Sequence, residues 1–386
     1  MKNMLSKDQV RLVHERIAPH LAPVLSLYVD VHPGRPENAR RGWFIRVKDS
    51  LKALDIPTTL YERVITLLSE ERAQARTLVL FAATDLLERY DLQVELPVVD
   101  LAHGRVECRW GEPYVTPLLY ALDEYERAGV LYLDRMSWRF YEIFLGEIEE
   151  ATDAFRDISP EEWQELTRYL PTLYDGLLKE RVATHPSRFA RRVEMWVQRF
   201  LKRLAHLLED VVVEHDIRRL VLLGPAEVTY FFEQYLPRSV RSRVVAHMSD
   251  IPYPIPSAAQ VLDKVTPILE KAERAHEQAL LDTVQERAGI WGLDPTLEAL
   301  QTGRLAALIV PWRIETQVWR CPEGWVASTP EMARIFCPES ELQEIPLRDV
   351  IVQLAADFGA RLEFVRGEAE QRLLKQYGGL AGLPRW

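Results

Sequence analysis

The sequence contains little cysteine, and it has no long hydrophobic run. Its three cysteines, Cys108, Cys321 and Cys337, are too few and too scattered for a disulfide framework, which indicates a reducing compartment. No segment approaches the roughly 20 apolar residues that span a bilayer, and the N-terminal residues lack the continuous apolar core of a signal peptide. We therefore expect a cytoplasmic protein with no membrane partner.

The composition is that of a folded, acidic, multidomain protein. Hydrophobic residues make up 47% and charged residues 27% of the 386 residues, so apolar surface suffices for buried cores. This length exceeds the usual domain size of about 100–200 residues, which predicts two or three domains. The formal net charge of −10 argues against indiscriminate binding to polyanions, and we expect no DNA partner. A local basic stripe can still act, because salt screens charges beyond about 8–10 Å.

Strand and helix patterns alternate along the chain and predict three α/β units. In the first unit, residues 1–126, the β-branched runs Val24–Val31 and Thr77–Ala83 predict strands between helices. In the last unit, residues 270–386, Leu305–Val310 predicts a further strand between helices. This alternation is typical of α/β domains.

The middle unit, residues 127–269, opens with two apolar runs separated by Asp134-Arg135, a pattern that predicts a hairpin. Helices follow, and then a strand, a turn at Gly224-Pro225 and another helix, so βα alternation returns. Ser257 precedes a long amphipathic run and is the expected N-cap of that helix.

A basic segment stands out in the middle unit: KERVATHPSRFARR, Lys179–Arg192. From Ser187 onward apolar residues recur at helical spacing, which predicts one long helix with a core-facing stripe. The stripe consists of Phe189, Val193, Trp196, Val197, Phe200, Leu204, Leu207 and Leu208. The basic residues off this stripe, with the loop before it, are the candidate phosphate contacts: His185, Ser187, Arg188, Arg191, Arg192, Arg199, Lys202 and Arg203.

Two interpretations of this segment remain open at this level. A helix N-terminus carries a partial positive charge and free N–H groups, so a loop there with arginines around it can bind phosphate. Arginines on an exposed helix face are also commonly solvated or paired with nearby carboxylates. His185 beside Ser187 is typical of helix capping rather than of a nucleophile and its base, and we assign no catalytic residue.

Three stretches together carry a family resemblance: GVLYLDRMSWRFYEIFLGEIEEA at 129–151, HPSRFARR at 185–192, and GIWGLDPTLEALQTGRLAALIV at 289–310, with a closing GGLAGLPRW. In that order they resemble the archaeo-eukaryotic peptide-chain release factor and Pelota superfamily, in its divergent bacterial and archaeal branch. The first resembles the hairpin that opens the central domain, the second the end of the catalytic loop, and the last two the C-terminal domain. The resemblance implies a ribonuclease-H-like central domain and a C-terminal three-layer α/β/α domain similar to kink-turn RNA-binding ribosomal proteins.

Two motifs of that superfamily are missing here. His185-Pro186-Ser187 stands where release factors have Gly-Gly-Gln, whose glycines let the backbone approach the peptidyl-tRNA ester and whose glutamine orients water. The first unit contains no Asn-Ile-Lys-Ser stop-codon motif. We therefore predict a protein without hydrolase activity, and a peptidyl-tRNA or other ester hydrolase with a divergent loop stays as an alternative.

The possible metal ligands are incomplete. Some relatives carry paired Cys-x-x-Cys knuckles, but here Cys321 and Cys337 are each the only cysteine of such a pair, and two thiols alone make a poor zinc site. We expect Cys108 to be a buried small residue and Gly224-Pro225 to be a tight βα turn. An acidic cluster is expected to be a solvated edge: Glu147, Glu149, Glu150 and Asp153. We predict no metal and no cofactor.

The resemblance suggests phosphates of ribosomal or transfer RNA as the partner of the basic segment. It implies a ribosome- or tRNA-associated release-factor-like protein in termination, rescue or quality control, with a translational GTPase docking on the C-terminal domain. The alternative from another class is a protein-interaction module of this fold that does not bind RNA.

Overall fold

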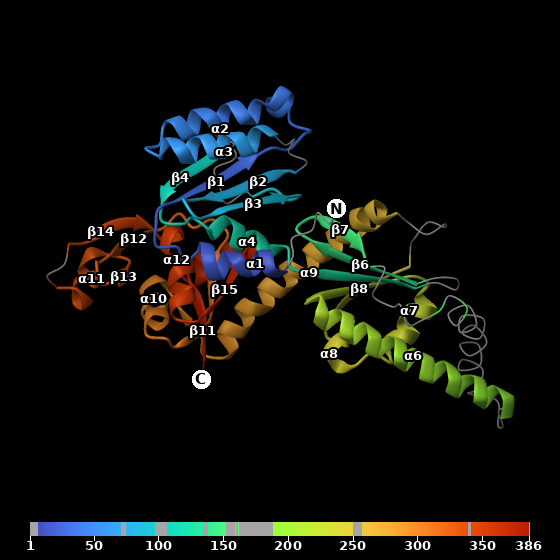
Figure 1. Cartoon of the computed structure of the whole chain (residues 1–386). Coiled ribbons are helices and arrows are strands. Elements are labelled where there is room, and N and C mark those ends of the chain that lie inside the picture. Colours follow the sequence, from blue (N-terminus) through green and yellow to red (C-terminus); the bar gives the residue numbers. More distant parts are fainter. Residues whose placement is uncertain are drawn as a thin grey trace. The chain divides into compact units, whose positions relative to one another are not determined.

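The computed structural model describes residues 7–70, 75–96, 106–133, 138–151, 159, 161, 188–249, 257–338 and 341–385. The chain forms two compact units, a central unit within Tyr125–Ala272 and a composite unit in which Leu5–Glu124 and Glu273–Trp386 come together. Both units are mixed α/β, which confirms the predicted fold class at that level (Figure 1). The division into three domains stays a prediction.

The central unit is built on a mixed five-stranded sheet. Its strands are β5 (Ala128–Leu133), β6 (Trp138–Phe144), β7 (Glu147–Glu150), β8 (Arg219–Leu223) and β9 (Val244–Met248), in the order β7-β6-β5-β8-β9. β5, β8 and β9 are parallel, and β6 is antiparallel to both of its neighbours. The β5–β6 pair confirms the predicted hairpin, while Asp134-Arg135 lies outside the described residues.

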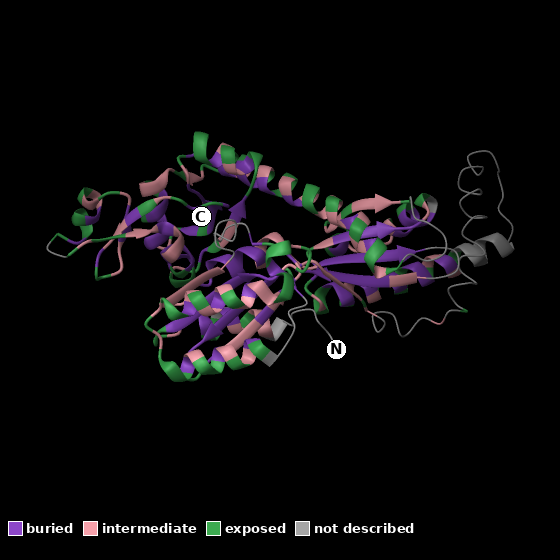
Figure 2. Ribbon diagram, turned by 90° about the horizontal axis from the view of Figure 1, so that it is seen from above, coloured by how far each residue is buried: buried purple, intermediate pink, exposed green. Residues whose placement is uncertain are grey.

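Helices cover both faces of this sheet, which is why β5 is buried along its whole length. α6 (Arg188–Glu214), α7 (Ala226–Glu233) and α8 (Arg238–Arg241) share one core with the sheet, to which α6 contributes Val197 and Leu204. The first part of α9 (Ala258–Glu286) packs Val261 and Val265 on the other face. β8 is also buried along most of its length, whereas the edge strands β7 and β9 are partly exposed; Figure 2 shows buried strands beside helices with exposed outer faces.

Two local predictions in this unit are confirmed. Ser257 caps α9, because its Oγ accepts a hydrogen bond from the N–H of Gln260 at 3.4 Å. Gly224 forms the tight βα turn between β8 and α7: its φ is +148°, and a Cβ there would lie 1.8 Å from the carbonyl oxygen of Leu133. Only glycine fits such a close backbone approach.

The first part of the composite unit is an antiparallel sheet with helices on it. β1 (Val24–Asp30), β2 (Thr77–Ala82), β3 (Leu87–Leu92) and β4 (Val106–Gly111) pair in the order β3-β2-β1-β4. α2 (Gly42–Lys52) and α3 (Thr58–Glu70) bury apolar side chains on one face. The helical segment before β1 consists of α1 (Lys7–Leu12) and a π-helix (Val13–Ile17), and a 3₁₀-helix (Pro36–Arg41) precedes α2. Cys108 on β4 is half-buried in this core, close to the expectation.

The second part carries a four-stranded sheet in the order β10-β16-β11-β15. Its strands are β10 (Ile290–Trp291), β11 (Leu305–Pro311), β15 (Arg361–Val365) and β16 (Ala381–Pro384), and β11 and β15 are the parallel pair. The last turns of α9 and α13 (Glu368–Gln376) form a core with this sheet. α10 (Leu293–Gln301) and α12 (Leu347–Asp357) complete the helices of this part.

α4 (Thr116–Glu124) joins the two parts of the composite unit. The Thr116 hydroxyl donates to the Arg348 carbonyl at 2.9 Å, and the Phe364 N–H donates to the Asp123 carboxylate at 2.9 Å. Tyr120 lies between these contacts, fully buried and edge-on to Phe364. This helix joins the N-terminal part to the C-terminal part, and the ion pair between Arg109 of β4 and Asp349 of α12 at 2.7 Å adds a direct contact.

A small lobe extends from the C-terminal sheet. It consists of β12 (Gln317–Arg320), β13 (Val326–Ala327), α11 (Pro330–Phe336) and β14 (Gln343–Pro346), with the strands in the order β13-β12-β14. Cys321 and Cys337 form a disulfide in this lobe, with Cα atoms 6.5 Å apart. The expectation that the cysteines form no disulfide is therefore wrong, because a β-hairpin followed by a short helix brings together two residues that are distant in sequence.

Among the described residues, none of the helices is both long enough and apolar enough to cross a membrane.

Candidate nucleic-acid interface

α6 presents a basic face opposite its buried face. Arg199, Lys202, Arg203 and His206 recur every three or four residues, so they line one side of the helix, and all four are exposed. The opposite side is fully buried, with Val197, Phe200, Leu201, Leu204, Ala205 and Leu208 in the core of the central unit. The predicted core-facing stripe is thus confirmed from Val197 to Leu208.

The structure describes the eight candidate contacts to different extents. His185 and Ser187 lie outside the described residues, so the proposed cap and loop stay predictions. Arg188, Arg191 and Arg192 lie on the first two turns of α6, where the backbone is described. Arg199, Lys202 and Arg203 have described, exposed side chains and form the part of the interface that the structure defines.

The charges along α6 run against the helix dipole. The first turn holds no acidic residue and the last turn no basic one, whereas Glu209, Asp210 and Glu214 gather in the C-terminal half. A helix end disfavours charges of its own sign by about 0.3–1 kcal/mol each, so this order does not serve helix stability. Instead it adds the side-chain charge to the positive end of the helix, which suits an anionic ligand.

The first turns of α6 extend beyond the sheet (Figure 1). This places the arginine-rich end away from the core that anchors the helix. In the C-terminal half, Glu209 accepts a hydrogen bond from the Ser239 hydroxyl of α8 at 2.6 Å and lies 3.7 Å from His206. Glu209 therefore makes contacts within the unit, while Arg199, Lys202 and Arg203 lie exposed at the surface.

Arginines elsewhere in the central unit have structural roles. Arg241 donates to the carbonyls of Glu233, Gln234 and Leu236 and so caps the end of α7. Arg127 pairs with Glu142, which also accepts a hydrogen bond from His215 at 2.8 Å. Burial raises the pKa of Glu142, but these two partners outweigh it and the pKa is lowered. This triad ties β5 and β6 to the residue that follows α6.

One aromatic and ionic cluster was not anticipated from the sequence. Tyr230 stacks on His247 with ring centroids 4.0 Å apart, and His247 Nε2 lies 3.0 Å from the Glu233 carboxylate. The three residues come from α7 and β9, so only the parallel pairing of β8 and β9 brings them together. In the sequence, Tyr230 and Glu233 stand three residues apart, a spacing that places them on one face of a helix. No pattern in the sequence indicates that His247 is their partner.

The acidic cluster lies on an edge strand, as predicted, but it is only partly exposed to solvent. Glu147, Glu149 and Glu150 lie on β7 at the edge of the sheet, and Glu150 pairs with Arg139 of β6 at 3.0 Å. Asp153 lies outside the described residues. An edge strand with charged side chains resists pairing with another sheet, which gives this cluster a structural role.

One protein family matches part of this chain. Residues 113–277 match the family described as "Bacterial archaeo-eukaryotic release factor family 10". Over these residues the chain is similar to that family. The resemblance seen in the sequence is thereby confirmed, and the matched residues include the hairpin, the basic helix and the first part of α9.

Solved structures of this superfamily are similar over most of the chain at low identity. Pelota of Archaeoglobus fulgidus is 14% identical over 82% of this chain and 81% of its own, with a TM-score of 0.32. An archaeal Pelota in a structure described as "Model of ribosome-bound archaeal Pelota and ABCE1" is 12% identical over 100% and 95%, with a TM-score of 0.41. Dom34 of S. cerevisiae is 8% identical over 80% of each chain, with a TM-score of 0.37. No curated protein matches the sequence.

Proposed function

We propose that this chain is a release-factor-like protein that associates with the ribosome or tRNA and acts in translation termination, rescue or quality control. The observation that carries the proposal is the one-sided basic face of α6, inside the region that matches the release-factor family. Phosphate contacts of this kind position a protein on RNA and give binding that depends steeply on salt.

The proposed contacts fall into two groups. Arg199, Lys202 and Arg203 lie exposed on α6, and Arg188, Arg191 and Arg192 extend the same helix toward its positive end. His185 and Ser187 would complete the site at the loop before the helix. RNA shape, rather than base sequence, is the target of such a surface.

The proposal includes no hydrolysis. The Gly-Gly-Gln of the superfamily is absent between Thr184 and Arg188, and the described residues near α6 offer structural ion pairs rather than a nucleophile with its base. A hydrolase with a divergent loop would have to place water with groups of a different kind.

The same proposal includes the folds of the individual domains, the location in the cell and the protein partner. The mixed sheet with helices on both faces supports a ribonuclease-H-like central domain, and the helices around β11 and β15 support a three-layer C-terminal domain like that of kink-turn RNA-binding proteins. A three-domain chain, a cytoplasmic location and a translational GTPase that docks on the C-terminal domain follow from the superfamily resemblance.

The test is co-sedimentation with ribosomes over a salt series. The variant Arg199→Ala/Lys202→Ala/Arg203→Ala should lower the slope of log affinity against log salt by about 2–3, since each neutralised phosphate contributes roughly 0.7–0.9. A control of equal charge, Lys52→Ala/Arg313→Ala/Lys375→Ala, changes exposed residues of the composite unit and should leave the slope unchanged.

Three other results would contradict the proposal. Absence of pelleting at low salt would exclude ribosome binding. Salt-insensitive binding to a protein partner without RNA would favour the interaction-module alternative. Turnover of peptidyl-tRNA that is lost in His185→Ala would favour a hydrolase.

A further inference from the structure

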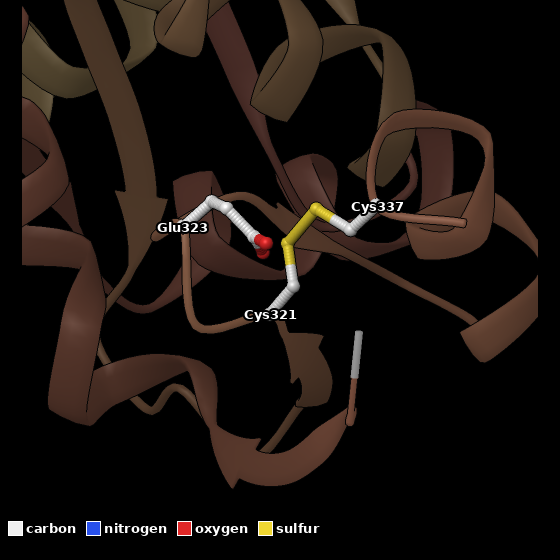
Figure 3. Close-up of side chains that lie close together, drawn as sticks. All are labelled: Cys321, Glu323 and Cys337. Carbon is white, nitrogen blue, oxygen red and sulfur yellow. A yellow bond between two sulfur atoms is a disulfide. The ribbon is translucent and has the colours of Figure 1, made fainter. Parts of the chain in front are cut away.

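The small lobe of the composite unit holds a cluster that could bind a metal ion: Cys321, Glu323 and Cys337. One ligand atom from each residue lies within 4.8 Å of the others, and no other such cluster was found among the residues the structure describes. Figure 3 shows the Glu323 carboxylate directed toward the sulfur atoms. Two ligands of a tetrahedral zinc ion lie about 3.5–4 Å apart, given Zn–S bonds of about 2.3 Å. The two sulfur atoms are bonded to each other in this structure, so a site of this kind forms only when the disulfide is broken and the sulfur atoms move apart to that distance.

The local fold fixes these positions. Cys321 follows β12 and opens a tight turn in which the Gly324 N–H donates to the Cys321 carbonyl at 2.8 Å. Glu323 is the third residue of that turn, which brings its side chain back beside Cys321. Cys337 ends α11, where its N–H donates to the Ala333 carbonyl at 3.0 Å. Each ligand is thus held by a turn or a helix end and not by an irregular loop.

The two cysteines and Glu323 differ in their exposure to solvent. Cys321 and Cys337 are 1% and 4% exposed, whereas Glu323 lies at the surface. Trp325 and Phe336 stack with ring centroids 4.0 Å apart in the same lobe. An ion at this point would have two sheltered thiolates and a carboxylate open to solvent, which leaves one coordination position for water or a partner's ligand.

The lobe has little else to hold it together. Its buried apolar residues are few: Val318, Val326, Ala327 and Ala333, besides the two cysteines. Hydrogen bonds tie it to α10, where Gln301 bonds Val326 and Asp294 accepts from the Ser328 N–H at 2.8 Å. A lobe with so small a core needs a covalent or metal staple.

We propose that this cluster exists in two states: a disulfide when oxidised, and a zinc site formed by Cys321, Glu323 and Cys337 when reduced. A thiol reductant of the glutathione or dithiol class supplies two electrons and two protons and cleaves the S–S bond to two thiols. Binding of Zn²⁺ releases those two protons as two Zn–S bonds form. Two thiolates and a carboxylate are ligands that zinc accepts.

The inference rests on the proposed function in one respect. A protein that works on ribosomes meets a reducing environment, in which disulfides are usually transient or redox-sensing. The metal-bound state is then the working state, and oxidation releases the ion while keeping the lobe closed.

The experiment uses the purified full chain without ribosomes, so its outcome is independent of RNA binding. Cobalt(II) serves as a visible probe of thiolate coordination, and zinc is counted by elemental analysis after gel filtration. The reduced protein should bind one equivalent, the oxidised protein none, and Cys321→Ser none in either state. Glu323→Gln should weaken binding at least about tenfold, while Cys108→Ser, a cysteine of the N-terminal sheet, should leave it unchanged.

Each of the following results would overturn one part of the proposal. Equal metal content in the reduced wild type and Cys321→Ser would exclude the site. Binding by the oxidised protein would exclude the two-state switch. Unchanged affinity in Glu323→Gln would remove the carboxylate from the ligand set.

Discussion

Glu277 of α9 is the buried carboxyl group whose environment gives the strongest pH prediction. Its side chain is 2% exposed, and its nearest cation is Arg274, at 3.2 Å. Arg274 also pairs with Glu124 at 2.5 Å, and Arg366 shares Glu124 at 3.3 Å. Burial raises the pKa of Glu277 to about 8, against the pull of Arg274 and with repulsion from Glu124 and Glu273.

The sign of the effect follows from proton linkage. Below about pH 4.5 both the folded and the unfolded chain hold the proton, so Glu277 does not affect the stability. Between there and about pH 8 the unfolded chain releases the proton while the folded chain keeps it, so the stability falls as the pH rises. Above pH 8 the loss is complete. A raised pKa of this size corresponds to a penalty on the order of 5 kcal/mol, since each unit is about 1.4 kcal/mol.

Glu277→Gln removes the titrating group and keeps its shape. We expect the variant to be more stable than the wild type at pH 9, by several kcal/mol, and the gain to vanish toward pH 5. Urea unfolding at a series of pH values, followed by tryptophan fluorescence, measures it. Glu286→Gln is the matched control, because Glu286 is exposed on the same helix and loses the same charge.

Parallel stability curves for the wild type and Glu277→Gln from pH 5 to pH 9 would refute the reasoning. They would mean that Glu277 is ionised in the folded protein and that Arg274 compensates its burial. A gain of equal size in Glu286→Gln would assign the effect to net charge instead of to the buried site.

Three further predictions test packing. Gly224→Ala should destabilise the central unit by about 3 kcal/mol or more, since a Cβ would lie 1.8 Å from the Leu133 carbonyl oxygen; thermal unfolding measures the loss. Leu204→Ala should cost about 2–5 kcal/mol in the same assay, whereas Arg199→Ala on the exposed face of the same helix should change stability by less than about 0.5 kcal/mol. Reduction of the disulfide without metal should cost the small lobe roughly 3 kcal/mol for a loop of this length, and hydrogen exchange of α11 would report it.

The sequence predicts the local elements well because their signals are local. The apolar stripe of α6 has a helical period, the β5–β6 hairpin has two apolar runs, and Ser257 has the character of an N-cap, and all three are confirmed. Gly224-Pro225 predicts a turn because glycine and proline between a strand and a helix are strong turn signals.

The sequence could not predict contacts between distant elements. Cys321 and Cys337 look like remnants of a lost metal site, and only the folded lobe shows that they face each other beside Glu323. The junction at Glu124 joins residues from α4, α9 and the loop after β15, and no period in the sequence relates them. The link between the N-terminal and C-terminal sheets through α4 was likewise invisible, since each sheet has its own clear pattern.

The two proposals can fail independently because they concern different compact units. The basic face of α6 belongs to the central unit, and the cysteine lobe belongs to the composite unit. If the α6 variant loses ribosome binding while metal uptake persists, the central unit carries the RNA contact and the lobe has a separate task. If metal release by oxidation also weakens ribosome binding, the lobe must contribute to the bound state, because α6 contains neither ligand nor cysteine. Measuring the salt slope in both redox states therefore distinguishes a lobe that regulates association from one that only stabilises its own fold.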